Sequence, residues 1–471
     1  MNAFLRKTAF NSRFALCIAL PFTLMAANAD WMSAQTQVNH VVIARTGDAA
    51  PAGGNYAHLN TVTLNRRGNA AFDSTLRGTD SSGVFTFDGT TSTAVALGGN
   101  SGPFDFVSVP IIDEFNRVLF SDDVAGLLRS EHSTIVPLVL NGDAAPGGGT
   151  LFPDLYVADP SGALAFHAFI SGDVNSEGIF RGHRPDTTAV VRLDQVPPLG
   201  GAFSLFGGFA INQRRQVAYY SVMTGGTADF AIFRKDGEAT RTIFAENQKA
   251  PGGGLLGDFS DPVMNEFGQV ATLGFALQNT DHAFGVFLGD GEKVIAIALS
   301  GQAAPRGGNY FLGTFAQNVL NNRGEVGFNV GLSGGSSTSG IFRGDGVHTT
   351  TIALQGDPAP GTNGATFAAF NNMKMLDDGR MAFEATLTFG VGDTTPTNNS
   401  GIWVGTSEKD LRLVVRAGDI IDGTMVKCIP ATPDRFDMSE KGVVWISGCS
   451  GRVPDLLVFS SFGEEDNSKK W

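Results

Sequence analysis

The sequence predicts an all-β protein, a single β-propeller of eight four-stranded antiparallel blades. Glycine (61 of 471 residues) and phenylalanine (37) are abundant, and only 17% of the residues are charged. That composition is typical of many short strands joined by tight turns, rather than of helices or disorder. A unit of 43 to 62 residues also recurs along the chain, with four short apolar runs in each copy. Four-stranded units of this length are typical of propeller blades.

The clearest repeated phrase is an apolar run followed by Gly-Asp, or a relative of it, and then by Ala-Pro and glycines. The Asp, Gln or Asn of this phrase occupies positions 48, 100, 143, 195, 248, 302, 357 and 419. Regular spacing indicates repeated structural units. Since one blade cannot bury both faces of its sheet, we expect the blades to stack in a ring.

A second phrase, Asn-x-x-Gly followed by small and aromatic residues, comes after each marker. It runs from Asn65 to Phe72 in the first unit, with later copies at 159–166, 212–219, 265–272 and 321–328. The Asn or Asp side chain bonds the main chain two residues on, and the Gly adopts the positive φ that closes a hairpin. The phrase predicts a tight turn between the first two strands of a unit.

A third phrase is Gly-Ile-Phe or a close variant, as at 178–180 and 340–342. It is usually followed by an Asp-Gly turn, as at 290–291, and then by one more apolar run. Asp-Gly between apolar runs is a strong hairpin signal. Each unit is therefore expected to hold four strands in sequence order, with no room for a helix.

The two ends of the chain are expected to close the ring together. The last unit supplies three predicted strands, at 425–429, 443–446 and 456–459, and then stops. An isolated strand, Val41 to Ala44, precedes the first marker. We expect it to pair with Leu456 to Phe459 as the fourth strand of the last blade, which leaves no open edge.

Residues 1–29 are expected to be a secretory signal peptide. Arg6, Lys7 and Arg13 precede an apolar stretch, and Ala27-Asn28-Ala29 offers a cleavage site. The rival interpretation, a membrane anchor, needs a longer apolar run. We expect a protein exported to the periplasm or the outside of the cell, with a propeller at 30–462, a polar tail at 463–471 and no membrane span.

Two cysteines, Cys428 and Cys449, remain once the signal peptide is removed. An even pair in an oxidising compartment indicates a disulfide bond, and both are expected in the first two strands of the last blade. The bond would enclose 20 residues and contribute roughly 3 kcal/mol in the chain-entropy model. Two separate buried thiols are the alternative.

The Asn-x-x-Gly-x-x-Ala-Phe phrase resembles the signature of the bacterial NxxGxxAF tandem-repeat family. The best copies are 65–72 and 321–328, and the resemblance covers nearly all of the chain after the signal peptide. It departs where Asn116 and Arg215 take the Gly position and Ser439 takes the Asn position. The resemblance implies exported repeats with no established activity. Members of the family often carry a C-terminal anchor, and the polar tail expected here does not match one, so the resemblance does not extend to attachment at the cell surface.

The candidate binding residues are the marker aspartates Asp48, Asp143, Asp357 and Asp419. All four fall on crossovers from one blade to the next, which we expect to crowd one face near the axis. They could form a ring of acceptors for a cation or for sugar hydroxyls. Alternatively, each aspartate caps its own Pro- and Gly-rich loop. We favour this second interpretation because Gln195, Gln248 and Gln302 replace Asp in three units, so the position does not need a charge.

No catalytic, metal-binding or cofactor-binding constellation is predicted. The seven histidines are scattered without metal-ligand spacing, and there is no nucleophile elbow or phosphate loop. His167 is interpreted as a satisfied core histidine. The arginines after Gly-Ile-Phe strands, at 181, 234 and 343, are interpreted as solvated edge residues rather than an anion site. The insertion at 393–400 is the one loop expected to be individual to this chain.

The formal net charge of −13 argues against a nucleic-acid partner, because no basic patch is visible in the sequence. We therefore expect a monomeric, non-catalytic binding or scaffolding propeller that grips a glycan or a protein partner through loops near the axis. The alternative is a propeller hydrolase or lyase whose carboxylates come from several blades. Convergence of a histidine with carboxylates would favour that alternative.

Overall fold

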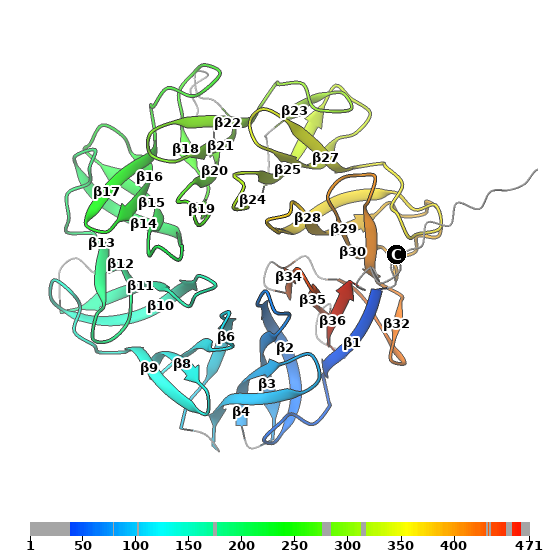
Figure 1. The fold of residues 1–471 in the computed structure, drawn as a ribbon, viewed down its shortest axis with the longest axis horizontal. Coiled ribbons are helices and arrows are strands. Elements are labelled where there is room, and N and C mark those ends of the chain that lie inside the picture. Colours follow the sequence, from blue (N-terminus) through cyan, green and yellow to red (C-terminus); the bar gives the residue numbers. More distant parts are fainter. Residues whose placement is uncertain are drawn as a thin grey trace, which may run out of the picture. The chain divides into compact units, whose positions relative to one another are not determined.

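The computed structural model describes residues 38–462, apart from residue 79 and the segments 101–102, 173–176, 276–283, 312–316, 430–431, 433–434 and 449–454. The described residues form eight antiparallel blades arranged in a ring, an eight-bladed β-propeller (Figure 1). They contain no α-helix, and the predicted fold class is confirmed. The predicted signal peptide, 1–29, and the tail, 463–471, lie outside the described residues.

The strands of each blade follow one another along the chain. Blade 1 contains β2 (Asn55–Leu64), β3 (Ala70–Arg77), β4 (Asp80–Phe87) and β5 (Ser92–Gly99). Blade 2 contains β6 (Val107–Ile112), β7 (Val118–Asp122), β8 (Gly126–Glu131) and β9 (Thr134–Leu140). Blade 3 contains β10 (Thr150–Ala158), β11 (Leu164–Ser171), β12 (Glu177–Arg181) and β13 (Thr188–Arg192). Blade 4 contains β14 (Ala202–Ile211), β15 (Val217–Thr224), β16 (Phe230–Asp236) and β17 (Ala239–Ala245).

In blades 5 and 6 the first strand is in two pieces, and both pieces pair with the second strand. Blade 5 contains β18 (Asp258–Phe259), β19 (Val263–Met264), β20 (Val270–Phe275), β21 (Gly285–Gly289) and β22 (Val294–Leu299). Blade 6 contains β23 (Asn309–Phe311), β24 (Asn318–Leu320), β25 (Val326–Ser333), β26 (Ser339–Gly344) and β27 (Thr349–Leu354). Blade 7 contains β28 (Phe367–Met375), β29 (Met381–Leu387), β30 (Ser400–Gly405) and β31 (Arg412–Arg416).

Blade 8 joins the two ends of the chain. It contains β34 (Phe436–Ser439), β35 (Gly442–Ser447), β36 (Leu456–Phe462) and the N-terminal strand β1 (Val38–Arg45), in that order from the first strand outward. Strand β1 runs antiparallel to β36, with Val41 opposite Phe459 and Ala44 opposite Leu457. The predicted closure is confirmed, because β1 covers the edge that β36 would otherwise expose.

The predicted strand at 425–429 is wrong. Its first residue belongs to a separate hairpin, β32 (Ile420–Ile421) with β33 (Thr424–Met425), and β34 takes its place in blade 8. Asp422 and Gly423 both have positive φ, 47° and 71°, which closes a tight turn directly after β32. Cys428 follows this hairpin instead of lying in a blade strand, and Cys449 lies outside the described residues. The disulfide remains a prediction.

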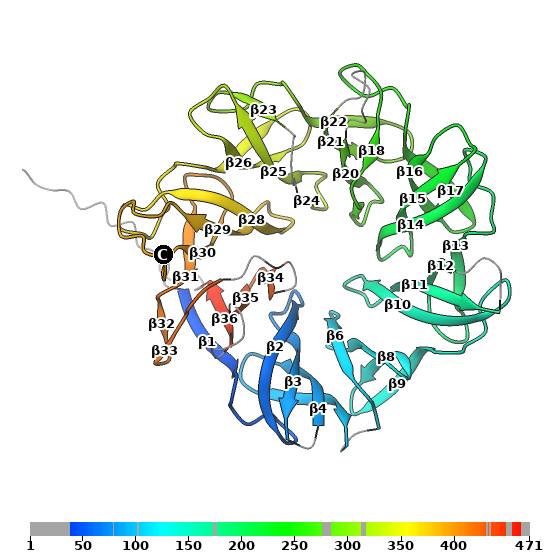
Figure 2. The same ribbon diagram turned by 180° about the vertical axis from the view of Figure 1, so that it is seen from behind.

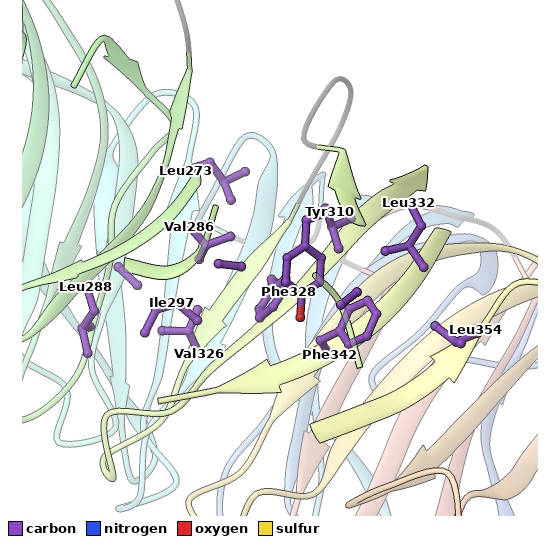
Figure 3. Close-up of a cluster of buried hydrophobic side chains, with 14 residues drawn as sticks. Leu273, Val286, Leu288, Ile297, Tyr310, Val326, Phe328, Leu332, Phe342 and Leu354 are labelled. Atoms are coloured by element: carbon purple, nitrogen blue, oxygen red, sulfur yellow. The ribbon is translucent and has the colours of Figure 1, made fainter. Parts of the chain in front are cut away.

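Paired aromatic rings fill the space inside and between blades. Phe328 and Phe342 stack with ring centroids 5.7 Å apart and an angle of 26° between their planes, and Tyr310 meets Phe342 edge-on. Figure 3 shows these rings beside Val286 and Ile297 of the preceding blade. The same pair recurs as Phe72 with Phe85 and as Phe166 with Phe180. Truncating one such buried ring to alanine typically costs about 3 to 5 kcal/mol.

The turn between the first and second strands of a blade, here called the inner turn, connects neighbouring blades. Asn265 accepts main-chain hydrogen bonds from Phe267 and Gln269 in its own turn, and its amide group donates to the carbonyl of Asn321 in the next blade (3.0 Å). Asn212 donates in the same way to the carbonyl of Asn265 (3.1 Å). The predicted turn is confirmed, and the repeated Asn also joins blade to blade.

The inner turns and the crossovers occupy different parts of the ring. Figures 1 and 2 show the inner turns pointing toward the middle of the ring, whereas the segments that lead from the last strand of a blade to the next blade run along the outside. No helix of the described residues is long and apolar enough to cross a membrane.

Candidate binding site

The marker residues cap their own crossovers. Asp143 and Asp419 each accept a hydrogen bond from the main-chain N–H three residues earlier, at 2.8 Å and 2.7 Å. Three glutamines at the same place in the repeat, Gln195, Gln248 and Gln302, do the same with their amide oxygens. Both residue types accept this bond, the aspartates at the shorter distances, which explains why the repeat can exchange Asp for Gln.

The structure does not bring the four predicted aspartates together. Asp357 pairs with Arg306 (2.6 Å), and the main-chain carbonyl of Asp48 accepts from Tyr56 (3.0 Å). No hydrogen bond or ion pair joins Asp48, Asp143, Asp357 or Asp419 to one another within the described residues. The expectation that the crossovers crowd the axis is corrected by their course along the outside of the ring (Figure 1). The hydrogen bonds support capping, and ligand binding by these loops stays untested.

The insertion at 393–400, expected to be individual to this chain, is tied to the last strand of its own blade. The guanidinium of Arg416, on β31, contacts both carboxylate oxygens of Asp393 at 2.9 Å and the carbonyl of Asn398 at 2.7 Å. Arg416 is only 6% exposed. A buried arginine with this many acceptors fixes the insertion against the blade.

The arginines at the end of the third strand join neighbouring blades, so their interpretation as solvated edge residues is wrong. Arg181 donates to the carbonyl of Arg215 (2.7 Å), at the glycine position of the next blade's inner turn. Arg234 and Arg343 donate to the equivalent carbonyls, those of Gly268 and Gly379. The planar guanidinium can reach a neighbouring strand end and a turn together, which explains why arginine recurs here.

Around Arg181, three blades enclose a basic cavity of about 290 Å³. Its lining comes from the inner turns of blades 2, 3 and 4 and from the ends of β8 and β12. The cationic and titratable lining residues are Arg117, Arg129, Arg181, Arg215 and His183. No carboxylate is among the residues that line this cavity.

Carboxylates neutralise two of the four arginines from outside the cavity. Arg117 pairs with Asp113 at 2.7 Å, and Arg129 donates to Glu131 at 3.1 Å. Arg181 donates only to main-chain carbonyls, those of Arg215 and Gly237. The guanidinium of Arg215 has no hydrogen bond or ion pair to any residue that the structure describes. The positive charges of Arg181 and Arg215 are therefore left without a carboxylate partner.

Arg215 occupies a backbone position that glycine normally takes. Its φ is 59°, in the left-handed region, whereas Gly268 and Gly324 hold the same place in the turns of blades 5 and 6. Holding a residue with a Cβ in this conformation costs roughly 1 to 2 kcal/mol. Strain of this kind is concentrated at functional sites, where the side chain contributes something that glycine cannot. Here the side chain brings a positive charge to the cavity.

A second cavity, also of about 290 Å³, adjoins the first and shares Arg181, Gly182 and Arg215 with it. Arg214, Asp186, Thr188 and Gly237 complete its lining. The guanidinium of Arg214 lies 5.7 Å from the ring centroid of Phe267, in the inner turn of blade 5, so a cation–π contact holds it in place. We call the two cavities together the basic site.

Burial lowers the pKa of Arg181 below its usual value, and the nearby charge of Arg215 acts in the same direction, while Glu238 and Asp236 oppose them. Two guanidinium groups that disfavour one another's charge are stabilised by an anion placed between them. Glu238 and Asp236 oppose the charge of Arg215 from a distance, but neither pairs with Arg181 or Arg215, so the geometry of the cavity favours a negatively charged ligand.

A separate cluster lies within blade 3. His167, on β11, has Nδ1 2.6 Å from a carboxylate oxygen of Asp154 on β10, and Nε2 3.6 Å from Glu177 on β12. His167 is 8% exposed, and one oxygen of Glu177 has no partner among the described residues. The histidine is satisfied, as expected, but by two carboxylates of its own blade. Among the described residues, this cluster included, no group of three His, Cys, Asp or Glu is placed to hold a metal ion.

The sequence interpretation missed the basic site, because its arginines are scattered from 117 to 215 and come together only through the ring. One signal was available: Arg215 stands where the Asn-x-x-Gly phrase has glycine. A bulky cation at a position that requires positive φ is unusual enough to mark a site.

The fold and the basic site define a repeat-built β-propeller with a cationic cavity between three of its blades. The chain belongs to the family of unknown function DUF7453, whose model matches residues 89–428. This match does not test the resemblance to the NxxGxxAF repeats, which stays a prediction.

No curated protein matches the sequence. Among solved structures, an oligogalacturonate lyase in complex with manganese is similar at 12% identity, covering 91% of this chain and 99% of that one, with a TM-score of 0.42. A Mycobacterium tuberculosis puromycin-hydrolyzing peptidase is similar at 13% identity over 84% of this chain and 60% of that one, with a TM-score of 0.44. PorZ, a surface component of the type-IX secretion system of Porphyromonas gingivalis, is similar at 13% identity over 87% and 57%, with a TM-score of 0.31.

Proposed function

We propose that this chain is an exported, non-catalytic binding or scaffolding propeller that recognises an anionic group of a glycan or protein partner at the basic site. One observation carries the proposal: Arg181 and Arg215 line a common cavity, and neither has a carboxylate partner among the described residues. In a chain of net charge −13, a local excess of positive charge is a specific feature and not a consequence of composition.

The chemistry of the site suits binding of a carboxylate, sulfate or phosphate group. Guanidinium groups match the planar or tetrahedral oxygens of such anions and form charge-assisted hydrogen bonds with them. The cavity volume of about 290 Å³ is near the lower end of the range for ligand pockets, roughly 300 to 1,000 Å³. A small anionic group fits such a cavity better than a folded surface does.

The substitution Arg215→Gly tests the proposal. Glycine is the residue that the turns of blades 1, 3, 5, 6 and 7 use at this position, so we expect R215G to keep the fold and to gain up to about 1 kcal/mol of stability from the relaxed φ. Binding of acidic glycans, measured by calorimetry on the mature protein, should fall by about tenfold or more, as expected when a charge-assisted hydrogen bond is lost.

The matched control is Arg306→Gly. Arg306 also has positive φ, 68°, but it lies in a crossover and pairs with Asp357 and Glu408. R306G removes the same charge and adds the same residue, and it should leave anion affinity unchanged. Equal loss in both variants would mean that overall charge, and not the basic site, attracts the ligand.

The alternative function is a hydrolase or lyase, and the cluster of Asp154, His167 and Glu177 supports it. A histidine between two carboxylates can transfer protons. The three residues come from one blade rather than from several, and the histidine is largely buried. Turnover of a bound glycan, abolished by His167→Gln, would favour this alternative over simple binding.

A further inference from the structure

The basic site has two cavities on either side of the same pair of arginines, and this arrangement limits the kind of ligand that fits. We infer that the ligand is an acidic oligosaccharide with two anionic groups, one in each cavity. This inference rests on the proposed anion-binding function and names the class of ligand that the same site takes. Arg181 and Arg215 form the shared wall, so each can contact both anionic groups.

Each cavity has its own additional cation. Arg117 and Arg129 belong to the first cavity and have carboxylate partners, whereas Arg214 belongs to the second and stacks on Phe267. A ligand with a single negative charge uses only the shared pair. The second cavity then holds Arg214 beside the single carboxylate of Asp186, and with Arg181 and Arg215 it keeps an excess of positive charge that a second anionic group would neutralise. The distribution of charge therefore fits a ligand with two charges rather than one.

The remaining lining favours a carbohydrate over an acidic peptide. Ser161 and Gln213 in the first cavity, and Thr188 in the second, offer hydroxyl and amide groups that pair with sugar hydroxyls. The carboxylate of Asp186 also lines the second cavity. A sugar hydroxyl can donate a hydrogen bond to this carboxylate, whereas the carboxylate side chain of an aspartate or glutamate cannot.

A nucleic acid fits the lining poorly. Among the described residues that line the two cavities there is no Phe, Tyr or Trp. Bases bound by proteins as single strands usually stack on aromatic rings, and long polyanions are repelled by a chain of net charge −13. A short ligand places only a few negative charges near the protein, so the net negative charge of the chain repels it less than it repels a long polyanion.

The experiment compares a ligand of one charge with a ligand of several. Glucuronate serves as the probe with one charge, observed by ligand-detected NMR, and a heparin tetrasaccharide serves as the probe with several, measured by calorimetry. Cellotetraose and tetra-aspartate are the neutral and peptide probes. We expect the tetrasaccharide to bind at least tenfold more tightly than glucuronate, with no binding of cellotetraose and weaker binding of tetra-aspartate.

The variant Arg214→Gln isolates the second cavity. It should lower affinity for the tetrasaccharide about tenfold and leave that for glucuronate unchanged, since only the second anionic group contacts Arg214. The matched control is Arg323→Gln, because Arg323 holds the same place in the inner turn of blade 6 and lines neither cavity. R323Q should bind both probes as the wild type does.

The outcomes separate this inference from the proposed function. If glucuronate binds and the tetrasaccharide binds no better, or if R214Q weakens both probes equally, the two-charge ligand is wrong while the anion site stands. If tetra-aspartate binds as tightly as the tetrasaccharide, the carbohydrate class is wrong. If neither glucuronate nor the tetrasaccharide binds, the proposed function itself fails.

Discussion

A single amide group distinguishes asparagine from aspartate in the inner turns, and the structure shows what that group does. In blades 4 and 5, Asn212 and Asn265 use the side-chain oxygen for their own turn and the side-chain N–H for a carbonyl of the next blade. Asp159 holds the same place in blade 3. Its Oδ1 accepts from Ala163, but its buried Oδ2 has no partner among the described residues.

The substitution Asp159→Asn should stabilise the fold by about 1 kcal/mol, because the new amide N–H can donate to the next blade as Asn212 and Asn265 do. The reverse change, Asn265→Asp, should destabilise it by about 1 to 3 kcal/mol, since the carbonyl of Asn321 loses its donor inside a buried site. Urea unfolding at pH 7 measures both. Destabilisation by both variants would contradict the role assigned to the amide.

At the scale of strands, a recurring bulge in the first strand of a blade is held by a polar side chain of the second strand. Asp73 accepts from the main chain (3.0 Å) and hydroxyl (2.6 Å) of Thr61, where the register of β2 shifts. Glu384 accepts from Asn372 (2.8 Å), at the shift in β28. Both acids follow the buried phenylalanine of the Asn-x-x-Gly phrase, so a carboxyl group is placed inside the sheet to satisfy the bulge.

This placement makes stability depend on pH. Burial raises the pKa of Glu384 to about 8, against the opposing effects of the Asn372 hydrogen bond and the charge of Lys374, compared with an ordinary 4.5. The folded protein therefore binds a proton that the unfolded chain has already released between these values. By linkage, the free energy of unfolding falls as pH rises from about 4.5 to about 8.

Glu384→Gln keeps an oxygen for the Asn372 hydrogen bond and removes the titration. We expect E384Q to lose the part of the pH dependence between about pH 5 and 8 that Glu384 causes, and to exceed the wild type in stability most at high pH. Urea unfolding at pH 5, 7 and 9 tests this, with the exposed Glu292→Gln as the control of equal charge change. Parallel pH profiles for wild type and E384Q would contradict it.

The strand order, the inner turns and the third-strand Phe positions could be predicted because each depends on residues close together in the sequence. Asn65 and Gly68 define a turn by local chemistry alone. The hairpin of β32 with β33 was not predicted, because Met425 begins an apolar run that was interpreted as a blade strand, although the Asp422-Gly423 pair before it is itself a hairpin signal. The basic site depends on three blades and was invisible to linear spacing.

At the scale of the whole molecule, the pairing of β1 with β36 completes blade 8, and hydrogen bonds from Leu64 to Asp437 and from Arg435 to the Leu59 carbonyl also join blade 8 to blade 1. Seven residues of β1 are in register with β36, and buried Leu457 and Val458 of β36 lie under this contact. The two strands are more than 400 residues apart in the chain, and yet Val41 to Ala44 could be placed beside 456–459 from the count of strands alone. The C-terminal part of the chain supplies three strands to the last blade, so a ring of four-stranded blades leaves one position there for the extra N-terminal strand.

Deleting the residues before Thr46 should therefore weaken the entire ring. The change removes β1, exposes β36 as an open edge and uncovers apolar side chains whose burial is worth about 1.5 to 3 kcal/mol each. We expect a loss of at least about 3 kcal/mol in urea unfolding, together with concentration-dependent association through the exposed edge. A synthetic peptide of residues 36–46, added in trans, should restore the transition midpoint, and a scrambled peptide of the same composition should not. An unchanged midpoint after the deletion would mean that the blades hold together without the N-terminal strand, and that the stability of the ring resides in the contacts between successive inner turns.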